Sequence, residues 1–141
     1  MAYWLFKSEP GTWSWENQTK KGKEGEGWDG VRNYQANNNM KKIKIGDLGF
    51  FYHSVKEKQI VGIVRVIGEH RPDPTDKKGI FGMVVIEAVQ EVKKYVHLSE
   101  MKSNHKLADL ALIKQARLSV VPISKEHWKE ICIMAETKNK F

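Results

Sequence analysis

The chain has 141 residues, of which 40% are hydrophobic and 29% are charged, with a formal net charge of +7. These values are typical of one globular domain and exclude a disordered or repetitive chain. No apolar run approaches the roughly 20 residues of a membrane span, and the start of the sequence does not resemble a signal peptide. We expect a cytoplasmic protein, or a nuclear one in a eukaryote, that does not bind membranes.

The first quarter of the chain predicts a strand, a turn and a short helix. Residues 3–6 are aromatic and aliphatic, and the Pro-Gly pair within 8–11 ends this strand. Ser14 is expected to cap a helix that fails by Gly22. Residues 20–27 are charged and rich in glycine, which predicts a mobile loop.

The middle of the chain predicts three strands. A short helix should end within 40–45, before an aromatic strand at 48–53. Residues 59–66 are mostly β-branched, as in a central strand buried on both faces. Two prolines make 71–79 an excursion loop, and apolar residues then alternate along a strand at 81–92, so that one of its faces meets water.

The last third predicts two helices around a short strand. Ser99 is expected to cap a single turn, and a helix should follow over 107–113. A strand at 118–123 precedes a helix capped by Ser124, whose apolar face includes Cys132. This lone cysteine is expected to be an inert core thiol. The pattern predicts a mixed α+β domain over 1–136, a polar tail at 137–141 and a monomer.

The stretch from Trp28 to Asn38 combines two aromatic rings, an arginine and several amides. It fits the wall of a pocket that takes a planar ligand such as a nucleobase. It fits equally the start of a surface helix with a buried tryptophan. Four of the five tryptophans lie within the first 28 residues, so some should be partly exposed, while Trp4 and Trp128 remain candidates for the core.

The sequence offers little support for catalysis or for a cofactor. None of the five histidines is spaced from another histidine or from the cysteine as zinc sites require. His53 and Ser54 are neighbours on a strand and point to opposite faces, so a hydrogen-bonding role is favoured over a nucleophile and its base. Dinucleotide and P-loop fingerprints are absent, and we expect no metal and no cofactor. The excess positive charge favours nucleic acid as a partner, although a lysine-rich surface can serve solubility alone.

Six motifs of the chain resemble the EVE domain family and occur in the family's order, from Tyr3 to about Ile131. They are Tyr3–Pro10, Trp28–Ala36, Gly46–Asp47 with Phe50–Ser54, Val61–Ile63, Pro72–Thr75 and Arg117–Val120. The resemblance implies a PUA-like fold related to YTH and ASCH domains: a curved β-barrel of about five to six strands with short helices around it. It also implies a pocket that reads a modified base in DNA or RNA.

The resemblance implies ligand-binding residues at several places in the chain. They are Lys7, Ser8, Glu9, Trp28, Asn33, Tyr34, Tyr52, His53, Ser54 and Arg117. The residue pattern itself adds Trp13, from the tryptophan-rich start of the chain, and Asn37, from the amide-rich stretch, as candidate ligand-binding residues. Six lysines beside this pocket would contact phosphates: Lys20, Lys21, Lys23, Lys41, Lys42 and Lys44. The chain departs from the family at Asn37, where an arginine is usual, at Ala116, where a serine is usual, and near Ile80 and Phe81, where a tryptophan is frequent.

Three functions remain open from the sequence. The first is a non-catalytic reader of a modified nucleobase, for which Trp28→Ala should abolish selective binding without unfolding the domain. The second is an enzyme acting on RNA or a nucleotide, with His53 or Glu9 as general acid or base. The third is a protein-interaction module that uses exposed tryptophans.

Overall fold

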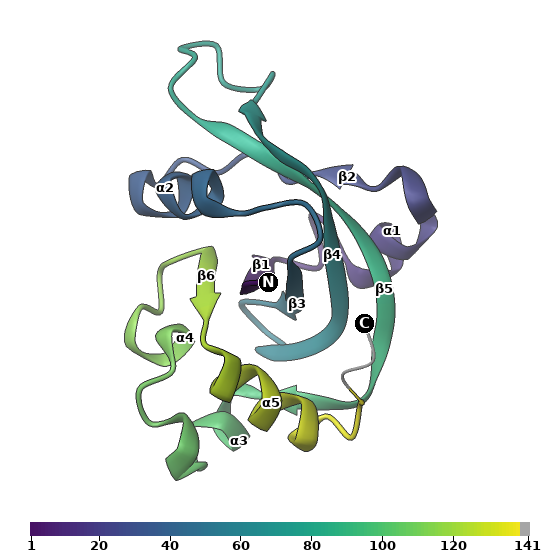
Figure 1. Cartoon of the computed structure of the whole chain (residues 1–141), viewed down its shortest axis with the longest axis vertical. Coiled ribbons are helices and arrows are strands. Elements are labelled where there is room, and N and C mark those ends of the chain that lie inside the picture. The colour runs from purple at the N-terminus through teal and green to yellow at the C-terminus, as the bar shows by residue number, and fades with distance from the viewer. Residues whose placement is uncertain (139–141) are drawn as a thin grey trace.

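A computed structural model describes residues 1–138 and contains a six-stranded mixed sheet with short helices around it (Figure 1). The strands are β1 (Tyr3–Ser8), β2 (Glu26–Gly27), β3 (Leu48–His53), β4 (Gln59–Pro72), β5 (Gly82–His97) and β6 (Val120–Ile123). Their order across the sheet is β2-β5-β4-β3-β1-β6. β1 and β3 are parallel, and the other neighbouring strands are antiparallel. The predicted α+β class is confirmed.

The helices are short and mostly begin at polar caps. They are α1 (Trp15–Lys20), α2 (Tyr34–Lys42), α3 (Leu98–Lys102), α4 (Ala111–Lys114) and α5 (Lys125–Met134), with 3-10 turns η1 (Gly22–Glu24) and η2 (His105–Leu107). Ser14 and Ser124 cap α1 and α5, as predicted. The expected cap at Ser99 is wrong, because the His97 ring accepts the Ser99 N–H and thereby caps α3. The single helix expected over 107–113 is also wrong, since a turn that buries Leu110 separates η2 from α4.

Two strands extend further than the sequence pattern indicates. β4 and β5 form a long hairpin in which Pro72 pairs with Gly82 at the outer end and Gln59 with His97 at the inner end. Pro72 fits there because the last residue of a strand can lack a backbone donor. The loop expected over 20–27 is also ordered into η1 and β2, and β2 adds an edge strand to β5.

The sheet bends strongly around the core. β4 and β5 curve together in Figure 1, and their pairing contains several register shifts, which bend strands locally. The expected closed barrel is not shown, because among residues 1–138 the edge strands β2 and β6 do not pair with each other. The fold is therefore a curved open sheet with helices at its ends and faces.

Tryptophans of α1 and α5 pack against β3 and β4 and fix the positions of these two helices. Trp128 of α5 stacks on Phe50 with ring centroids 4.0 Å apart, which confirms its predicted place in the core. Trp15 of α1 lies on Gly62, where an added Cβ would come within 2.4 Å of the ring. This close approach holds α1, and the turn before it, against the sheet.

The packed part of the chain extends past the expected boundary at residue 136. Thr137 is buried, and its hydroxyl accepts a hydrogen bond from the Lys93 N–H at 2.9 Å. Residues 139–141 of the expected tail lie outside the described residues. Within residues 1–138, no helix has the length and apolar character that a membrane crossing needs.

Candidate functional site

A cavity of about 430 Å³ opens beside the end of β1, a volume within the range of small-molecule sites. The end of β1 and the following turn form one wall, and the segment from β2 to Arg32 forms the other. The lining residues are Lys7, Ser8, Glu9, Thr12, Trp13, Glu26, Gly27, Trp28, Asp29, Gly30, Val31, Arg32 and Ser119. Five of the predicted ligand-binding residues meet here, namely Lys7, Ser8, Glu9, Trp13 and Trp28.

Trp28 joins the cavity to the core. Its ring packs edge-to-face against Phe6 and Phe51, with centroids 5.5 and 5.7 Å apart, and only 7% of the residue is exposed. Its backbone N–H donates to the Val84 carbonyl at 2.7 Å, which ties this wall to β5. The ring is therefore a rigid surface at the bottom of the cavity, and it is also a core residue.

Trp13 is the more accessible aromatic ring of the cavity, since it is only partly buried. Its indole N–H donates to the Gln18 side-chain oxygen at 2.9 Å. Gln18 is fully buried and donates in turn to the Ile86 carbonyl at 3.1 Å. The Ser8 hydroxyl donates to the Trp13 carbonyl, so Ser8 can offer a ligand only its lone pairs. Both residues are thus held in place before any ligand binds.

The cavity carries charges of both signs. The Lys7 ammonium donates to the Ala116 carbonyl at 2.7 Å, and burial lowers the pKa of this group. Arg32 adds a second cation, whereas Glu9, Glu26 and Asp29 contribute carboxylates. Cations attract phosphate oxygens, and carboxylates accept hydrogen bonds from the exocyclic amino groups of bases. The cavity therefore offers partners for both parts of a nucleotide.

Asp73, in the loop between β4 and β5, holds the wall formed by residues 29–32. Its carboxylate accepts from the Gly30 N–H at 2.8 Å and from the Arg32 guanidinium at 3.1 Å. The Thr75 N–H and hydroxyl donate to its other oxygen at 2.8 and 2.7 Å. Burial alone would raise the pKa of Asp73, but these hydrogen bonds outweigh it and hold the pKa at about 2. The carboxylate is therefore ionised whenever the protein is near neutral pH.

Three residues of the stretch expected to form the pocket wall lie elsewhere. Asn33 caps α2 by accepting from the Ala36 N–H, and Tyr34 lies 65% exposed on the outer surface. Asn37 is buried and accepts hydrogen bonds from the Gly82 N–H and from the His70 ring, both at 3.0 Å. The helix that begins at Tyr34 carries these side chains away from the cavity. The surface-helix interpretation therefore holds from Asn33 onward.

The expected residues at the end of β3 do not line the cavity. Tyr52 is buried, and burial raises its pKa to about 12. The Nε2 atom of His53 accepts from the Trp15 N–H at 3.0 Å, and its Nδ1 lies 2.9 Å from Glu57. The Ser54 N–H donates to the Ser8 carbonyl at 2.8 Å. These residues support the wall instead, because β3 pairs with β1 and none of the three lines the cavity.

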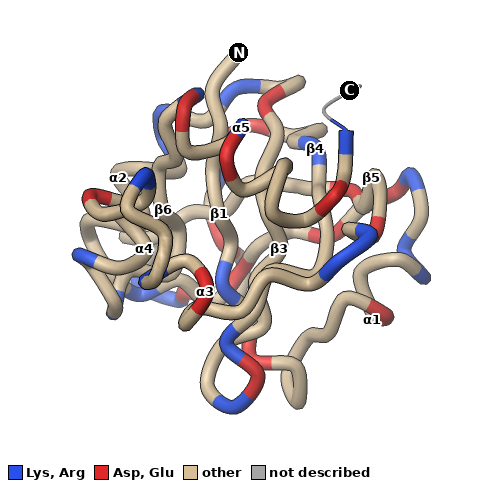
Figure 2. The backbone as a smooth tube through the Cα atoms, turned by 90° about the horizontal axis from the view of Figure 1, so that it is seen from below, with Lys and Arg blue, Asp and Glu red and all other residues tan. Residues whose placement is uncertain are grey.

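Arg117 and the six lysines also lie outside the cavity lining. Arg117 is exposed in the loop before β6, where Ser119 faces the cavity instead. Lys20 and Lys21 form ion pairs with Glu16 and Glu26 at 3.3 and 3.5 Å. Lys23, Lys41, Lys42 and Lys44 are exposed. Positive and negative residues are interspersed around the backbone, so the basic excess is spread over the molecule (Figure 2).

Eight lining residues are not among the ligand-binding residues predicted from the sequence: Thr12, Glu26, Gly27, Asp29, Gly30, Val31, Arg32 and Ser119. Four of them, Asp29 to Arg32, belong to the stretch that begins at Trp28. Asp73 and Thr75, which belong to one of the six family motifs, were the available signal that this wall is held in place. A polar motif in a loop is expected to make a contact. Its partner could not be inferred from the sequence.

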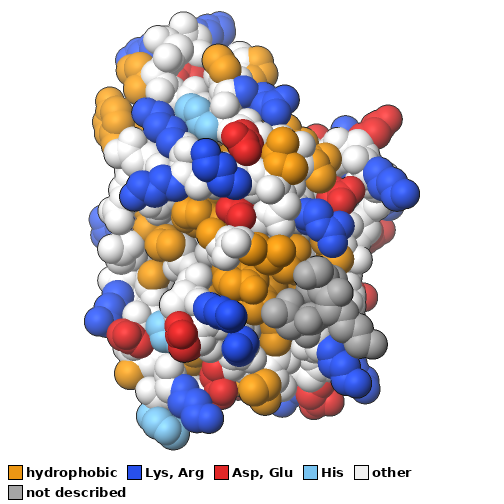
Figure 3. Space-filling model, viewed as in Figure 1, with side chains coloured by type: hydrophobic (Ala, Val, Ile, Leu, Met, Phe, Trp, Pro, Cys, Tyr) orange, Lys and Arg blue, Asp and Glu red, His pale blue; other side chains and the backbone are white. Residues whose placement is uncertain are grey.

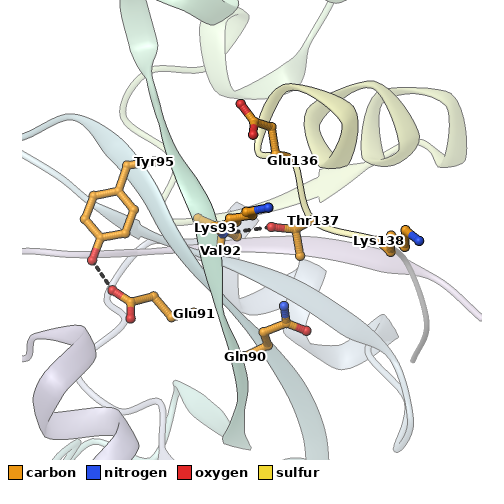
Figure 4. A pocket seen from close by; sticks show the side chains of 8 residues that line it. All are labelled: Gln90, Glu91, Val92, Lys93, Tyr95, Glu136, Thr137 and Lys138. Atoms are coloured by element: carbon orange, nitrogen blue, oxygen red, sulfur yellow. Dashed lines mark hydrogen bonds between the residues drawn. The ribbon is translucent and has the colours of Figure 1, made fainter.

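A second depression of about 980 Å³ lies between β5 and the end of α5. Its lining residues spread over an outer surface in Figure 4, where the Tyr95 hydroxyl donates to Glu91 and the Lys93 N–H donates to Thr137. It has one aromatic ring and borders the end of the described residues, so it offers less for a planar ligand. Among residues 1–138, no three His, Cys, Asp or Glu side chains cluster as a metal site requires.

Comparison with known proteins identifies relatives across the whole chain. Mouse thymocyte nuclear protein 1 is 33% identical over 96% of this chain and 74% of its own length. A crystal structure of a protein from Agrobacterium tumefaciens is 48% identical, with a TM-score of 0.94, and covers 99% of this chain and 96% of its own. Human THYN1 protein, crystallised in complex with 5-methylcytosine-containing DNA, is 31% identical with a TM-score of 0.89. That match covers 98% of this chain and 99% of the human chain.

A more distant structure supports the fold alone. The ZmASCH protein of Zymomonas mobilis has a TM-score of 0.61 at 9% identity and covers 95% of this chain and 99% of its own. This likeness agrees with a PUA-like fold. The family profile described as EVE domain matches residues 2–134. The chain therefore belongs to the EVE domain family.

Proposed function

We propose that this EVE domain is a non-catalytic reader that binds nucleic acid and holds one modified base in the cavity between β1 and residues 26–32. The observation that carries the proposal is the pairing of Trp13 and Trp28 with cations and carboxylates around one space of about 430 Å³. An aromatic surface stacks on a base, and the polar groups around it can read the base edge. The human relative crystallised with 5-methylcytosine-containing DNA makes 5-methylcytosine the first base to test.

The apolar part of the lining supports selection of an added methyl group. Val31, Trp13 and Trp28 contribute hydrocarbon surface to the lining. Burying one methyl group stabilises a complex by roughly 0.8 kcal/mol, which corresponds to about a fourfold difference in Kd. A preference for 5-methylcytosine over cytosine of at least this size is therefore expected.

The enzyme hypothesis has less support. Both ring nitrogens of His53 are occupied by the Trp15 N–H and by Glu57, so the ring has no free atom for a substrate proton. Glu9 lies at the cavity, but its carboxylate is already engaged, since it accepts hydrogen bonds from the Gly11 N–H at 3.0 Å and from the Thr12 hydroxyl at 3.4 Å. Binding without turnover is the function that this geometry supports.

The test is a titration of fluorescent oligonucleotides that carry cytosine or 5-methylcytosine at one position, as single and double strands. The wild type should bind the methylated strand at least about fourfold more tightly. Trp13→Ala should bring the ratio of the two Kd values close to 1, because it removes the accessible ring while the Trp13 backbone remains. Tyr95→Ala removes an aromatic side chain on the far part of β5 and should leave the ratio unchanged.

Thermal melting of each variant shows whether it is folded. Equal affinity of the wild type for both strands would rule out 5-methylcytosine as the base that is read, and oligonucleotides with other base modifications would then be tested. An unchanged ratio in folded Trp13→Ala would contradict the assignment of the cavity. Hydrolysis or conversion of any oligonucleotide during the titration would favour the enzyme.

A further inference from the structure

A second aromatic surface lies outside the cavity, at the outer end of the β4–β5 hairpin. The rings of Tyr34 and Phe81 are 5.1 Å apart between centroids and tilted by 45°. The guanidinium carbon of Arg32 is 5.8 Å from the centre of the Phe81 ring. We call Arg32, Tyr34 and Phe81 the aromatic platform. Tyr34 is 65% exposed, which is unusual for a large ring that serves only the core.

Each member of the aromatic platform is held by the backbone around it. Tyr34 is the first residue of α2, which Asn33 caps. The Phe81 N–H donates to Asp76 at 2.7 Å, and the Asp73 N–H donates to the Phe81 carbonyl at 3.2 Å. Arg32 donates to Asp73 and to Thr75. A ligand would therefore meet a preformed surface and would not have to order it.

Four lysines lie on the two segments that carry the rings of the aromatic platform, namely α2 and the loop between β4 and β5. Lys41, Lys42, Lys77 and Lys78 are exposed, and none of them forms an ion pair within residues 1–138. The nearby carboxylates are already engaged: Asp76 accepts from three backbone N–H groups, and Asp73 is buried. Lys and Arg side chains gather over α2 and below the hairpin in Figure 3. Aromatic faces among free cations match the alternation of bases and phosphates in a nucleic-acid strand.

Arg32 connects the aromatic platform to the cavity. It lines the cavity and at the same time lies beside the Phe81 ring. A strand with one base in the cavity would therefore leave it past Arg32 and reach Tyr34 next. A protein partner would need an apolar patch of larger area, whereas this surface joins one exposed ring to several separate cations.

We propose that the aromatic platform is a second stacking site, which takes the unmodified base next to the one held in the cavity. This inference rests on the proposed nucleic-acid function and adds a contact that is independent of the modification. Alanine substitution at a base-stacking ring typically weakens binding by roughly 5- to 150-fold. The loss at Tyr34 should be the same for methylated and unmethylated strands.

The experiment compares Tyr34→Ala with Tyr34→Phe, which keeps the ring, and with Tyr95→Ala, an exposed tyrosine elsewhere. Single strands carry cytosine or 5-methylcytosine, and each is made with either a normal base or an abasic site at the neighbouring position. Tyr34→Ala should bind the normal strands roughly 5- to 150-fold more weakly than the wild type. On strands with an abasic site at the neighbouring position that faces the aromatic platform, Tyr34→Ala and the wild type should have equal affinity. Tyr34→Phe and Tyr95→Ala should retain wild-type affinity.

The outcomes separate this inference from the proposed function. Wild-type affinity of Tyr34→Ala for every strand, with methyl selectivity intact, would overturn the second stacking site alone. An equal loss of affinity of Tyr34→Ala on normal and abasic strands would also overturn the second stacking site, because the Tyr34 ring would then not act through a base. Loss of methyl selectivity with a Tyr34 effect still present would overturn only the base-reading function. A lower molecular mass of Tyr34→Ala in sedimentation would instead identify a contact between two copies of the chain.

Discussion

The buried carboxylate of Asp73 accepts a hydrogen bond from the backbone N–H of Gly30 at 2.8 Å. Gly30 has a φ of +78°, a conformation that glycine adopts more readily than other residues. This contact joins two of the chain's family motifs and fixes one wall of the cavity. Residues that touch no ligand thus decide where the lining residues lie.

Asp73→Asn should destabilise the protein in a way that depends on pH. The folded pKa of about 2 lies below the ordinary value of 3.8, so the ionised carboxylate stabilises the folded state above about pH 4. This contribution, roughly 2 kcal/mol at neutral pH, is lost as the pH falls toward 2. Urea unfolding should therefore show a large difference between wild type and variant at pH 7 and almost none near pH 2.

Asp29→Asn is the matched control for that measurement. Asp29 lies at the same cavity, is exposed, and its side chain forms no hydrogen bond among the described residues. Its substitution should leave the free energy of unfolding unchanged at either pH. Equal stability of wild type and Asp73→Asn at pH 7 would show that Asp73 does not hold the wall.

His53→Ala should lower stability although His53 does not touch the cavity. Because Nε2 accepts from the Trp15 N–H, the ring proton is on Nδ1, which donates to Glu57. The variant leaves a buried N–H without a partner, at a cost of about 1–3 kcal/mol. Urea denaturation measures this loss, and His105→Ala, at an exposed position, provides the control. A loss of unfolding free energy no larger than that of His105→Ala would contradict the structural role of His53.

Trp28→Ala should unfold a substantial fraction of the protein. The sequence predicts that this variant stays folded, but Trp28 is only 7% exposed and packs against Phe6 and Phe51. Replacing a buried tryptophan by alanine costs roughly 3–5 kcal/mol. The midpoint of thermal unfolding should therefore fall much more for Trp28→Ala than for Trp13→Ala. A melting temperature equal to that of the wild type would show that Trp28 is not a core residue.

The lysines that the sequence indicates for phosphate contacts should differ in effect. Lys41→Gln with Lys42→Gln removes two cations without ion pairs, whereas Lys20→Gln with Lys21→Gln removes two that are paired with Glu16 and Glu26. Each lost phosphate contact changes the slope of log K against log salt by about 0.7 for a single strand. Titrations at several salt concentrations should show a shallower slope for the first double variant only. Equal slopes would place the phosphate path elsewhere.

Cys132 should resist alkylation in the native protein. Burial raises the pKa of its thiol to about 11, so little thiolate exists at neutral pH. Mass spectrometry after treatment with iodoacetamide should find the native protein mostly unmodified and the protein in concentrated urea fully modified. Equal labelling rates in the two conditions would show that the helix α5 opens readily.

Local features of the fold could be predicted because they depend on neighbours in the sequence. The caps at Ser14 and Ser124 bond to backbone groups three residues away. The core face of α5 follows from helical periodicity, and the buried central strand follows from its β-branched residues. The cap at His97 and the short strand β2 were not predicted. A histidine is an uncommon helix cap, and a strand of two residues is too short to show a sequence pattern.

The sequence by itself determined the family and the mixed fold, and it indicated Trp13 and Trp28 as ligand-binding candidates. Only the tertiary structure decided which polar residues of each motif face that cavity. Asn37 and His53 look like recognition groups in a linear motif, yet they bond to backbone or side-chain groups of other segments. The physical reason is that buried polar groups require partners, and those partners come from strands and loops that only folding brings near.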